Sequence, residues 1–119
     1  MMDLLNEYRE RRADQNKKVI DNADKVIKRI YSLDTITYTE GALDEKTKEI
    51  IGLTTSLVLR CDDCVKYHLE KCVELGYSKA QIIEGMGVAN VVGGTIVIPH
   101  LRRAVEYLEA LSQEIEEEK

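Results

Sequence analysis

The sequence contains almost no large aromatic side chains and almost no proline. It has no Trp, no Phe, six Tyr and a single Pro in 119 residues. The core must therefore be built mainly from Ile, Leu, Val, Ala and Met. Proline would interrupt helix interiors, whereas the abundant Glu, Lys, Arg and Leu favour helices. This composition predicts an all-α chain.

Long apolar runs and a basic surface are also missing. No apolar stretch approaches the ~20 residues needed to cross a membrane, and the opening sequence MMDLLNEYRERR lacks the apolar segment of a signal peptide. The formal net charge is −5, with an acidic excess in the C-terminal EIEEEK, which argues against nucleic acid as a partner. We therefore expect a cytoplasmic protein that binds neither nucleic acid nor a membrane.

The length of 119 residues is near the usual size of one domain, so we expect residues 1–119 to form a single domain. Apolar positions recur at helical spacing over residues 1–31, which predicts an N-terminal helical extension. The strongly charged segment 10–18 is a place where this helix can break. Residues 32–43, SLDTITYTEGAL, contain β-branched residues and a glycine and are predicted to form a loop.

Local signals predict several helices after this loop. Asp44 has a side chain suited to cap a helix start, and Gly76 is suited to end one. The SKAQ sequence at 78–81 has the form of a capping box, and the pair Gly93–Gly94 interrupts the helix that follows. The expected result is a bundle-like domain of five to six helices. The inner face of the helix after the capping box is expected to hold Ile82, Ile83, Met86 and Ala89.

The stretch LRCDDCVKYHLEKC holds all three cysteines and one of the two histidines. Cys61, Cys64, His68 and Cys72 are acceptable zinc ligands. On a continuous helix, however, Cys61 and Cys72 would lie roughly 16 Å apart along the axis, whereas four zinc bonds of about 2.0–2.3 Å must converge on one point. A helix here excludes a four-ligand site, and only Cys61, Cys64 and His68 together remain geometrically able to bind a metal.

Two other interpretations apply to different cysteines. Cys72 lies among apolar residues and is expected to be a core residue, as free cysteine often is. Cys61 and Cys64 instead form a C-x2-C pair at a helix start, where the helix dipole favours a thiolate. His68 follows Cys64 by one turn on the same face and can accept its proton. This arrangement is typical of a redox-active thiol.

Glu49 is a further candidate for the same site. If the helices on either side of Arg60 fold back on each other, Glu49 lies within a turn or two of His68. A carboxylate there can orient the imidazole and accept its proton. The alternative, a solvated glutamate on the helix surface, stays open at this stage.

Together these residues read E-x11-C-x2-C-x3-H. This pattern resembles the signature of the AhpD-like (alkylhydroperoxidase D-like) branch of the carboxymuconolactone decarboxylase family. The resemblance extends from about Leu43 to Leu111 and includes the segment GYSKAQIIEGMGVANVVGG. It implies an all-α fold, assembly into trimers or hexamers, and thiol-dependent reduction of hydroperoxides without a cofactor or a metal.

The resemblance also implies a role for each site residue. Cys64 would attack the peroxide, Cys61 would resolve the product, and Glu49 and His68 would relay protons. A separate dithiol protein, lipoyl-linked or thioredoxin-like, would recharge the pair. The two aspartates of CDDC are a departure from the family pattern, because their charge opposes thiolate formation. They favour slower peroxide chemistry and a larger role in dithiol–disulfide exchange.

Two alternatives do not need this chemistry. One is a decarboxylase-type lyase that acts on a small lactone or acid, with His68 and Glu49 as acid and base and no role for the cysteines. The other is a non-enzymatic metal-binding or structural module.

The segment 85–98, GMGVANVVGGTIVI, predicts self-association because it is uncharged over its whole length. Such a segment is either core or interface. We therefore expect a homo-oligomer that uses this segment and part of the last helix. His100, just after it, is expected to be structural.

Overall fold

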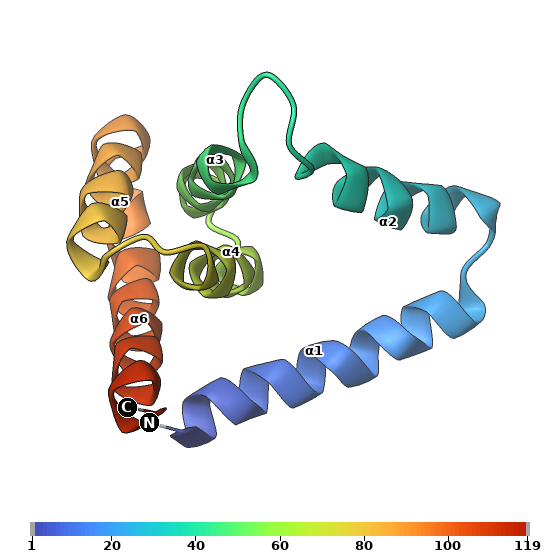
Figure 1. Ribbon diagram of the computed structural model, residues 1–119, viewed down its shortest axis with the longest axis horizontal. Helices are drawn as coiled ribbons and strands as arrows, with labels where there is room; N and C mark the ends of the chain where they lie inside the picture. The colour runs from blue at the N-terminus through green and yellow to red at the C-terminus, as the bar shows by residue number, and fades with distance from the viewer. Residues whose placement is uncertain (1, 119) are drawn as a thin grey trace.

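The computed structural model describes residues 2–118, and within that range every regular element is helical (Figure 1). This confirms the all-α class and the bundle of six α-helices. No helix in the described range is long and apolar enough to span a bilayer. The elements are α1 (Met2–Asn22), α2 (Lys25–Thr37), α3 (Glu45–Val58), α4 (Asp62–Glu74), α5 (Lys79–Gly93), the 3₁₀ helix η1 (Thr95–Val97) and α6 (Ile98–Glu118).

The predicted helix boundaries after residue 43 are found where local capping chemistry placed them. The Asp44 side chain accepts a hydrogen bond from the backbone of Thr47 at the start of α3. Ser78 and Gln81 form the complete capping box of α5. Gly76, which follows α4, has a φ of 96°, a conformation that favours glycine. These sequence signals fix the helices that carry the site.

The core lies where α3, α4, α5 and α6 pack against one another. Tyr107 is the largest fully buried side chain, and its ring meets the edge of Tyr8 with 5.6 Å between centroids. Leu5 and Tyr8 of α1 are buried, both near its N-terminal end. The aliphatic core that the composition predicts is otherwise made by Leu53, Leu57, Val65, Leu69, Ile82, Met86, Val97, Leu108 and Leu111.

Two predictions about the N-terminal region are wrong. The helix does not break in the charged segment 10–18, because α1 continues to Asn22. Ion pairs between residues four apart, such as Lys17–Asp21 at 2.7 Å, support an exposed helix there. The expected loop at 32–43 is helical as far as Thr37. The Thr37 hydroxyl donates to the Leu33 carbonyl one turn earlier, so this polar side chain is satisfied within the helix.

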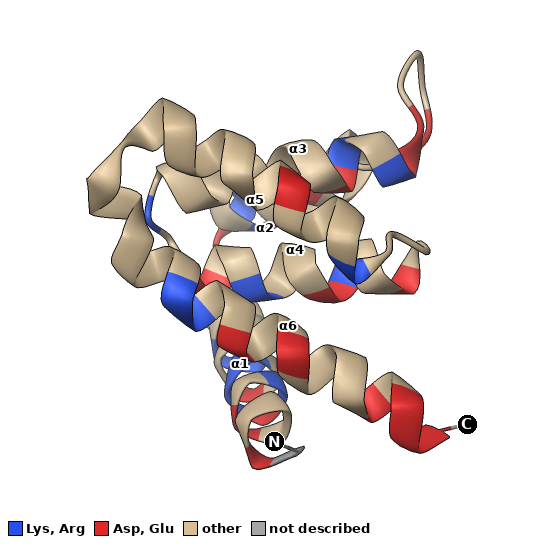
Figure 2. Cartoon of the chain, turned by 90° about the vertical axis from the view of Figure 1, so that its left-hand side faces the viewer, with Lys and Arg blue, Asp and Glu red and all other residues tan. Residues whose placement is uncertain are grey.

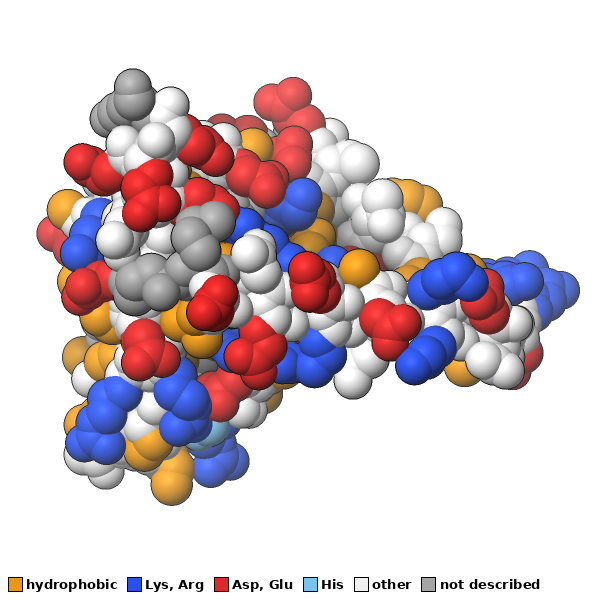
Figure 3. Space-filling model, turned by 90° about the horizontal axis from the view of Figure 1, so that it is seen from below, with side chains coloured by type: hydrophobic (Ala, Val, Ile, Leu, Met, Phe, Trp, Pro, Cys, Tyr) orange, Lys and Arg blue, Asp and Glu red, His pale blue; other side chains and the backbone are white. Residues whose placement is uncertain are grey.

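The second half of α1 and all of α2 form an arm, residues 14–37, that extends away from the bundle (Figures 1 and 3). None of the residues of α2 is buried. Its apolar side chains are therefore uncovered in a single chain. The large exposed apolar residues of the arm are Val19, Ile20, Val26, Ile27, Ile30, Tyr31, Leu33 and Ile36.

Helix α5 is covered on one side only. Ile82, Met86 and Ala89 are buried as predicted, but Ile83 is 39% exposed, so its expected inward position is wrong. The reason is that α5 lies at the edge of the bundle, where only a narrow stripe contacts the core. Its outer surface carries little charge (Figure 2). The most exposed apolar side chains here are Val88, Val91, Val92 and Ile96.

Candidate active site

The turn between α3 and α4 places the two cysteines. Arg60 adopts a φ of 62°, which reverses the chain immediately before Cys61. Cys61 is the N-cap of α4, and its sulfur accepts a hydrogen bond from the backbone N–H of Cys64 at 3.2 Å. The two residues are joined as a disulfide, with their Cα atoms 5.2 Å apart. Cys64 is the more exposed residue of the two, and it is the one that lines the cavity described next.

Glu49 and His68 form a buried pair next to this disulfide. His68 Nδ1 lies 2.8 Å from Glu49 Oε1, and the two residues are 7% and 2% exposed. The hairpin of α3 and α4 therefore brings them together as its geometry predicts. Glu49 is buried, so the alternative of a solvated glutamate on the helix surface is wrong. A buried carboxylate needs such a partner, because desolvation without one is costly.

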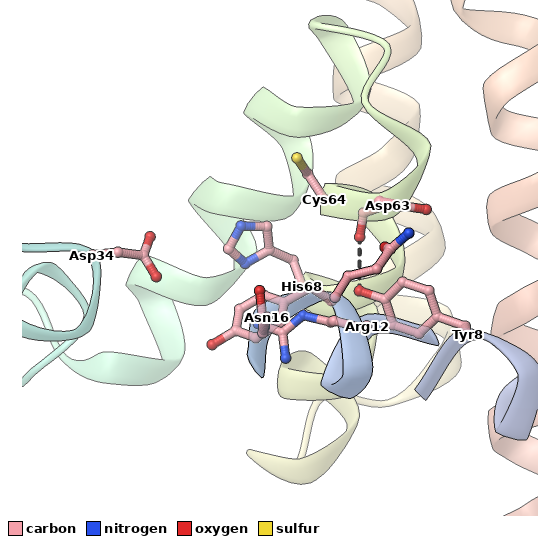
Figure 4. Close-up of a pocket in the computed structure, with 9 residues that line it drawn as sticks. Tyr8, Arg12, Asn16, Asp34, Asp63, Cys64 and His68 are labelled. Carbon is pink, nitrogen blue, oxygen red and sulfur yellow. Dashed lines mark hydrogen bonds between the residues drawn. The ribbon is translucent and has the colours of Figure 1, made fainter. Parts of the chain in front are cut away.

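An open cavity of about 290 Å³ gives access to the disulfide and the histidine. Cys64 and His68 of α4 line one wall, while Arg12 and Asn16 of α1 and Asp34 of α2 face them across the space (Figure 4). No hydrogen bond joins Cys64 to His68 among the residues described, in this oxidised form of the pair. The complete lining is Tyr8, Arg12, Gln15, Asn16, Asp34, Asp63, Cys64, Tyr67 and His68.

The α1 and α2 side of this cavity was not predicted from the sequence. The guanidinium of Arg12 lies 4.4 Å from the centre of the Tyr67 ring, and Tyr67 meets His68 edge-on at 5.1 Å. The Tyr8 hydroxyl donates to the carbonyl of Asp63 at 3.0 Å and ties α1 to the start of α4. The cavity residues of α1 and α2 precede the stretch that carries the family resemblance, so that pattern could not indicate them.

The two aspartates between the cysteines are both paired with basic groups. Asp62 lies 2.8 Å from His100 Nδ1 and accepts a hydrogen bond from Arg103 at 2.8 Å. Burial raises the pKa of Asp62, but the hydrogen bonds from His100 and Arg103 outweigh it and bring the pKa below 3.8. Asp63 pairs with Arg11 at 3.2 Å in an exposed position. The negative charge expected to oppose the thiolate is thus partly compensated, and His100 takes part in that compensation.

Cys72 is separate from the site. It is fully buried, and burial raises the pKa of its thiol to about 12. The expectation that it is a core residue is confirmed. Within residues 2–118 no group of three or more His, Cys, Asp or Glu side chains is placed to hold a metal ion.

Comparison with known proteins identifies the family. A model of the carboxymuconolactone decarboxylase family matches residues 25–107. The chain belongs to this family. The matched region begins at the start of α2, earlier than the stretch from Leu43 on which the sequence resemblance rests. The arm is therefore partly inside the family domain.

Solved structures and curated proteins of similar sequence agree with this assignment. TM1620 of Thermotoga maritima is 49% identical, with 96% of this chain and 99% of that chain covered and a TM-score of 0.90. A second crystal structure of TM1620 has a TM-score of 0.89, and a part in an antioxidative response has been suggested for that protein. The apo structure of lpg0406, a family member from Legionella pneumophila, is 25% identical, covers 92% of this chain and 98% of its own, and has a TM-score of 0.83.

A curated relative is more distant. Uncharacterized protein 4 in the cox locus of Paracoccus denitrificans is 26% identical over 80 residues, which are 67% of this chain and 72% of that protein. The family assignment therefore rests on the family model and on the structures, whereas the activity has to be argued from the site.

Proposed function

We propose that the protein is a thiol-dependent peroxidase and disulfide oxidoreductase that reduces organic hydroperoxides through Cys61 and Cys64. The observation that carries this proposal is the position of the disulfide. It lies at the start of α4, where the exposed residue Cys64 lines a cavity together with His68. The helix N-terminus favours a thiolate at this position. The buried Glu49 carboxylate orients the imidazole one turn further on.

The chemistry follows from the reduced form of the pair. His68 takes the proton of the Cys64 thiol, and the thiolate attacks the terminal oxygen of the hydroperoxide. The O–O bond breaks, Cys64 becomes a sulfenic acid, and the alkoxide leaves with the proton from His68 as an alcohol. The Cys61 thiol then displaces water from the sulfenic acid and forms the disulfide seen in the structure. Two electrons pass from the two thiols to the peroxide.

A separate dithiol closes the cycle. One of its thiolates attacks the Cys61–Cys64 disulfide to give a mixed disulfide, and its second thiol releases both protein thiols. A lipoyl-linked or thioredoxin-like protein has this chemistry, and the exposed Cys64 sulfur gives it access. The same requirement for a reducing partner favours a cytoplasmic location.

The proposed active form is a homo-oligomer, a trimer or a hexamer. Two apolar surfaces of the chain are uncovered, one on α5 and η1 and the other on the arm. The first surface coincides with segment 85–98, whose uncharged sequence predicts an interface. Every copy of the chain carries both surfaces, so copies of the same chain can bury them against one another. Val91 and Val92 are 85% and 72% exposed, and they have the most apolar surface to bury in an interface.

Steady-state turnover of cumene hydroperoxide with dithiothreitol as the reductant tests the proposal. The native protein should consume the peroxide, and Cys64→Ser should reduce the rate to the uncatalysed level. Cys72→Ser is the matched control, because Cys72 lies in the core and away from the cavity. Full activity of the Cys64→Ser variant would rule out the proposed mechanism.

A further inference from the structure

The imidazole of His68 is held from a second side by Tyr38. The Tyr38 hydroxyl lies 3.5 Å from His68 Nε2, and the two ring centres are 5.4 Å apart with the planes tilted by 45°. Tyr38 is the residue that caps the C-terminal end of α2. His68 is therefore flanked by Glu49 at one ring nitrogen and by Tyr38 at the other.

Gly52 provides the space in which these two side chains meet. It lies in α3, one turn after Glu49. A Cβ atom at this position would be 2.7 Å from His68 Cε1, 2.9 Å from His68 Nε2 and 2.9 Å from the Tyr38 hydroxyl. Real Cβ atoms essentially never approach other atoms this closely. Glycine weakens a helix interior compared with alanine. Its presence here is explained by the space that the His68 ring needs.

We propose that Tyr38 is a positioning residue for His68 and that Gly52 makes this contact possible. Glu49 accepts a hydrogen bond from Nδ1–H, so Nε2 is the ring nitrogen that can take up a further proton. A hydroxyl group can both donate and accept, so Tyr38 donates to Nε2 when His68 is neutral and accepts from it once Nε2 is protonated. Burial and the nearby Glu49 raise the pKa of Tyr38, which keeps its proton in place for the first of these states.

This inference rests on the proposed function for one point, the transfer of a proton from Cys64 to His68. Tyr38 acts on that step through His68 alone, because it does not line the cavity beside Cys64. With both ring nitrogens held, the imidazole keeps one orientation and one tautomer. Without Tyr38, the ring can turn away from the orientation that serves Cys64.

The test is the reactivity of Cys64 in Tyr38→Phe, measured in a Cys61→Ser background so that Cys64 is the thiol observed. Iodoacetamide alkylation at pH 7 should be about two- to tenfold slower, the range that corresponds to one hydrogen bond. The ¹⁵N shifts of the His68 ring should change as well. Tyr77→Phe is the control, since Tyr77 follows α4 and lies outside the cavity. Unchanged alkylation together with unchanged His68 shifts would overturn the proposal.

Gly52→Ala tests the space itself, with Gly41→Ala as its control. Gly41 lies in the loop before α3 and outside segment 85–98, and a Cβ there would meet Lys48 Nζ at an ordinary contact distance of 3.6 Å. Gly52→Ala should lower the urea midpoint and slow alkylation of Cys64, whereas Gly41→Ala should do neither. In a His68→Ala background, the loss caused by Gly52→Ala should shrink. A Gly52→Ala variant that behaves like Gly41→Ala would contradict the inference.

These measurements remain informative if the proposed function fails. Alkylation, ring shifts and urea midpoints need no peroxide and no turnover. A protein that reduces no hydroperoxide can still show the Tyr38 effect on Cys64. A protein that reduces hydroperoxides, with Cys64 reactivity and His68 shifts both unchanged in Tyr38→Phe, would retain the function and lose this inference.

Discussion

Glu49 and His68 form one buried contact between two helices, and in the proposed mechanism this contact prepares Cys64 for reaction. Glu49 is 2% exposed and lies 2.8 Å from His68 Nδ1. The imidazole contributes to the chemistry only if its free nitrogen accepts a proton. The carboxylate supports this state by holding the other nitrogen as a donor. In the proposed mechanism, Cys64 thus depends on Glu49 as well, although Glu49 does not line the cavity.

The role of His68 can be measured with His68→Gln. Glutamine retains a polar group near Glu49 but cannot act as a base. The rate of Cys64 oxidation by hydroperoxide should fall on the order of a hundredfold, the lower end of what a general base contributes. Stopped-flow measurements at equal folded fractions provide the comparison. A rate within about twofold of the native value would show that His68 does not serve the thiol.

Cys72 should be inert in the folded protein. Its burial raises its thiol pKa to about 12, and the thiolate is the form that reacts. After reduction, iodoacetamide at pH 8 should label Cys61 and Cys64 and leave Cys72 unlabelled until denaturant is added. Trypsin separates these sites, since cleavage after basic residues releases peptides 61–66 and 72–79. Rapid labelling of the second peptide without denaturant would contradict the assignment of Cys72 to the core.

At the scale of elements, an ionic cluster fastens α1 to α4 and α6. Arg9 pairs with Glu70 at 2.6 Å and with Glu114 at 2.7 Å, and the Tyr107 hydroxyl donates to Glu70 at 2.9 Å. The hydrogen bond from Arg9 is the main reason that the pKa of Glu114 lies below 4.5. Because the cluster holds the first turns of α1 against the bundle, it also positions the α1 residues of the cavity.

Arg9→Met should therefore lower the free energy of unfolding by about 1–3 kcal/mol at pH 7, the range for hydrogen bonds to charged groups. The stabilisation from Glu114 is complete above the unfolded pKa of 4.5 and is lost as the pH falls through the lower folded value. The variant should accordingly lose less stability than the native protein on acidification below about pH 5. Urea unfolding at several pH values measures both effects.

Arg11→Met is the control for this cluster. The Arg11 pair with Asp63 is exposed, and such pairs contribute about 0–1 kcal/mol. If Arg9→Met and Arg11→Met cost the same, or if the acid dependence of Arg9→Met matched that of the native protein, the cluster would not have the assigned role.

The sequence predicted the elements whose signals are local. Asp44 and Gly76 mark helix ends through their own side chain or backbone. These helix ends could therefore be predicted without knowledge of the tertiary structure. Residues 25–31 of α2 fall within the predicted N-terminal helical extension, whereas its last residues, 32–37, were predicted as a loop because the segment 32–43 contains β-branched residues and a glycine. The proximity of Glu49 and His68 could be predicted because residues at similar distances from the turn of a helical hairpin face each other. Tyr38 was not found, because its contact depends on where the end of α2 lies against α3.

At the scale of the whole molecule, the monomer has more apolar surface than its own core covers. The outer side of α5 and the arm lie on different parts of the chain (Figures 1 and 2). Contiguous exposed apolar surface of this kind marks an interaction site. Tyr38 caps the C-terminal end of α2 and contacts His68. A partner that covers α2 would therefore also restrict the motion of Tyr38. In the proposed oligomer, assembly and the site would therefore be linked through the arm.

Sedimentation equilibrium tests the assembly. The native protein should be a trimer or a hexamer at micromolar concentration, and Val92→Asp or Leu33→Asp should shift it toward the 13.6 kDa monomer, since each buries a charge in an apolar contact. Ala80→Asp is the control, at an exposed position near the start of α5. A native protein that sediments as a monomer would exclude the oligomer.

The central claim is that Cys61 and Cys64 exchange electrons with a hydroperoxide as a pair. Mass spectrometry of the reduced protein after a brief exposure to stoichiometric cumene hydroperoxide tests it most directly. The account predicts a rapid loss of two hydrogens from the tryptic peptide 61–66, which contains both cysteines, and no such loss in Cys64→Ser. An unchanged mass of peptide 61–66 in the native protein, under conditions that consume the peroxide, would contradict the account.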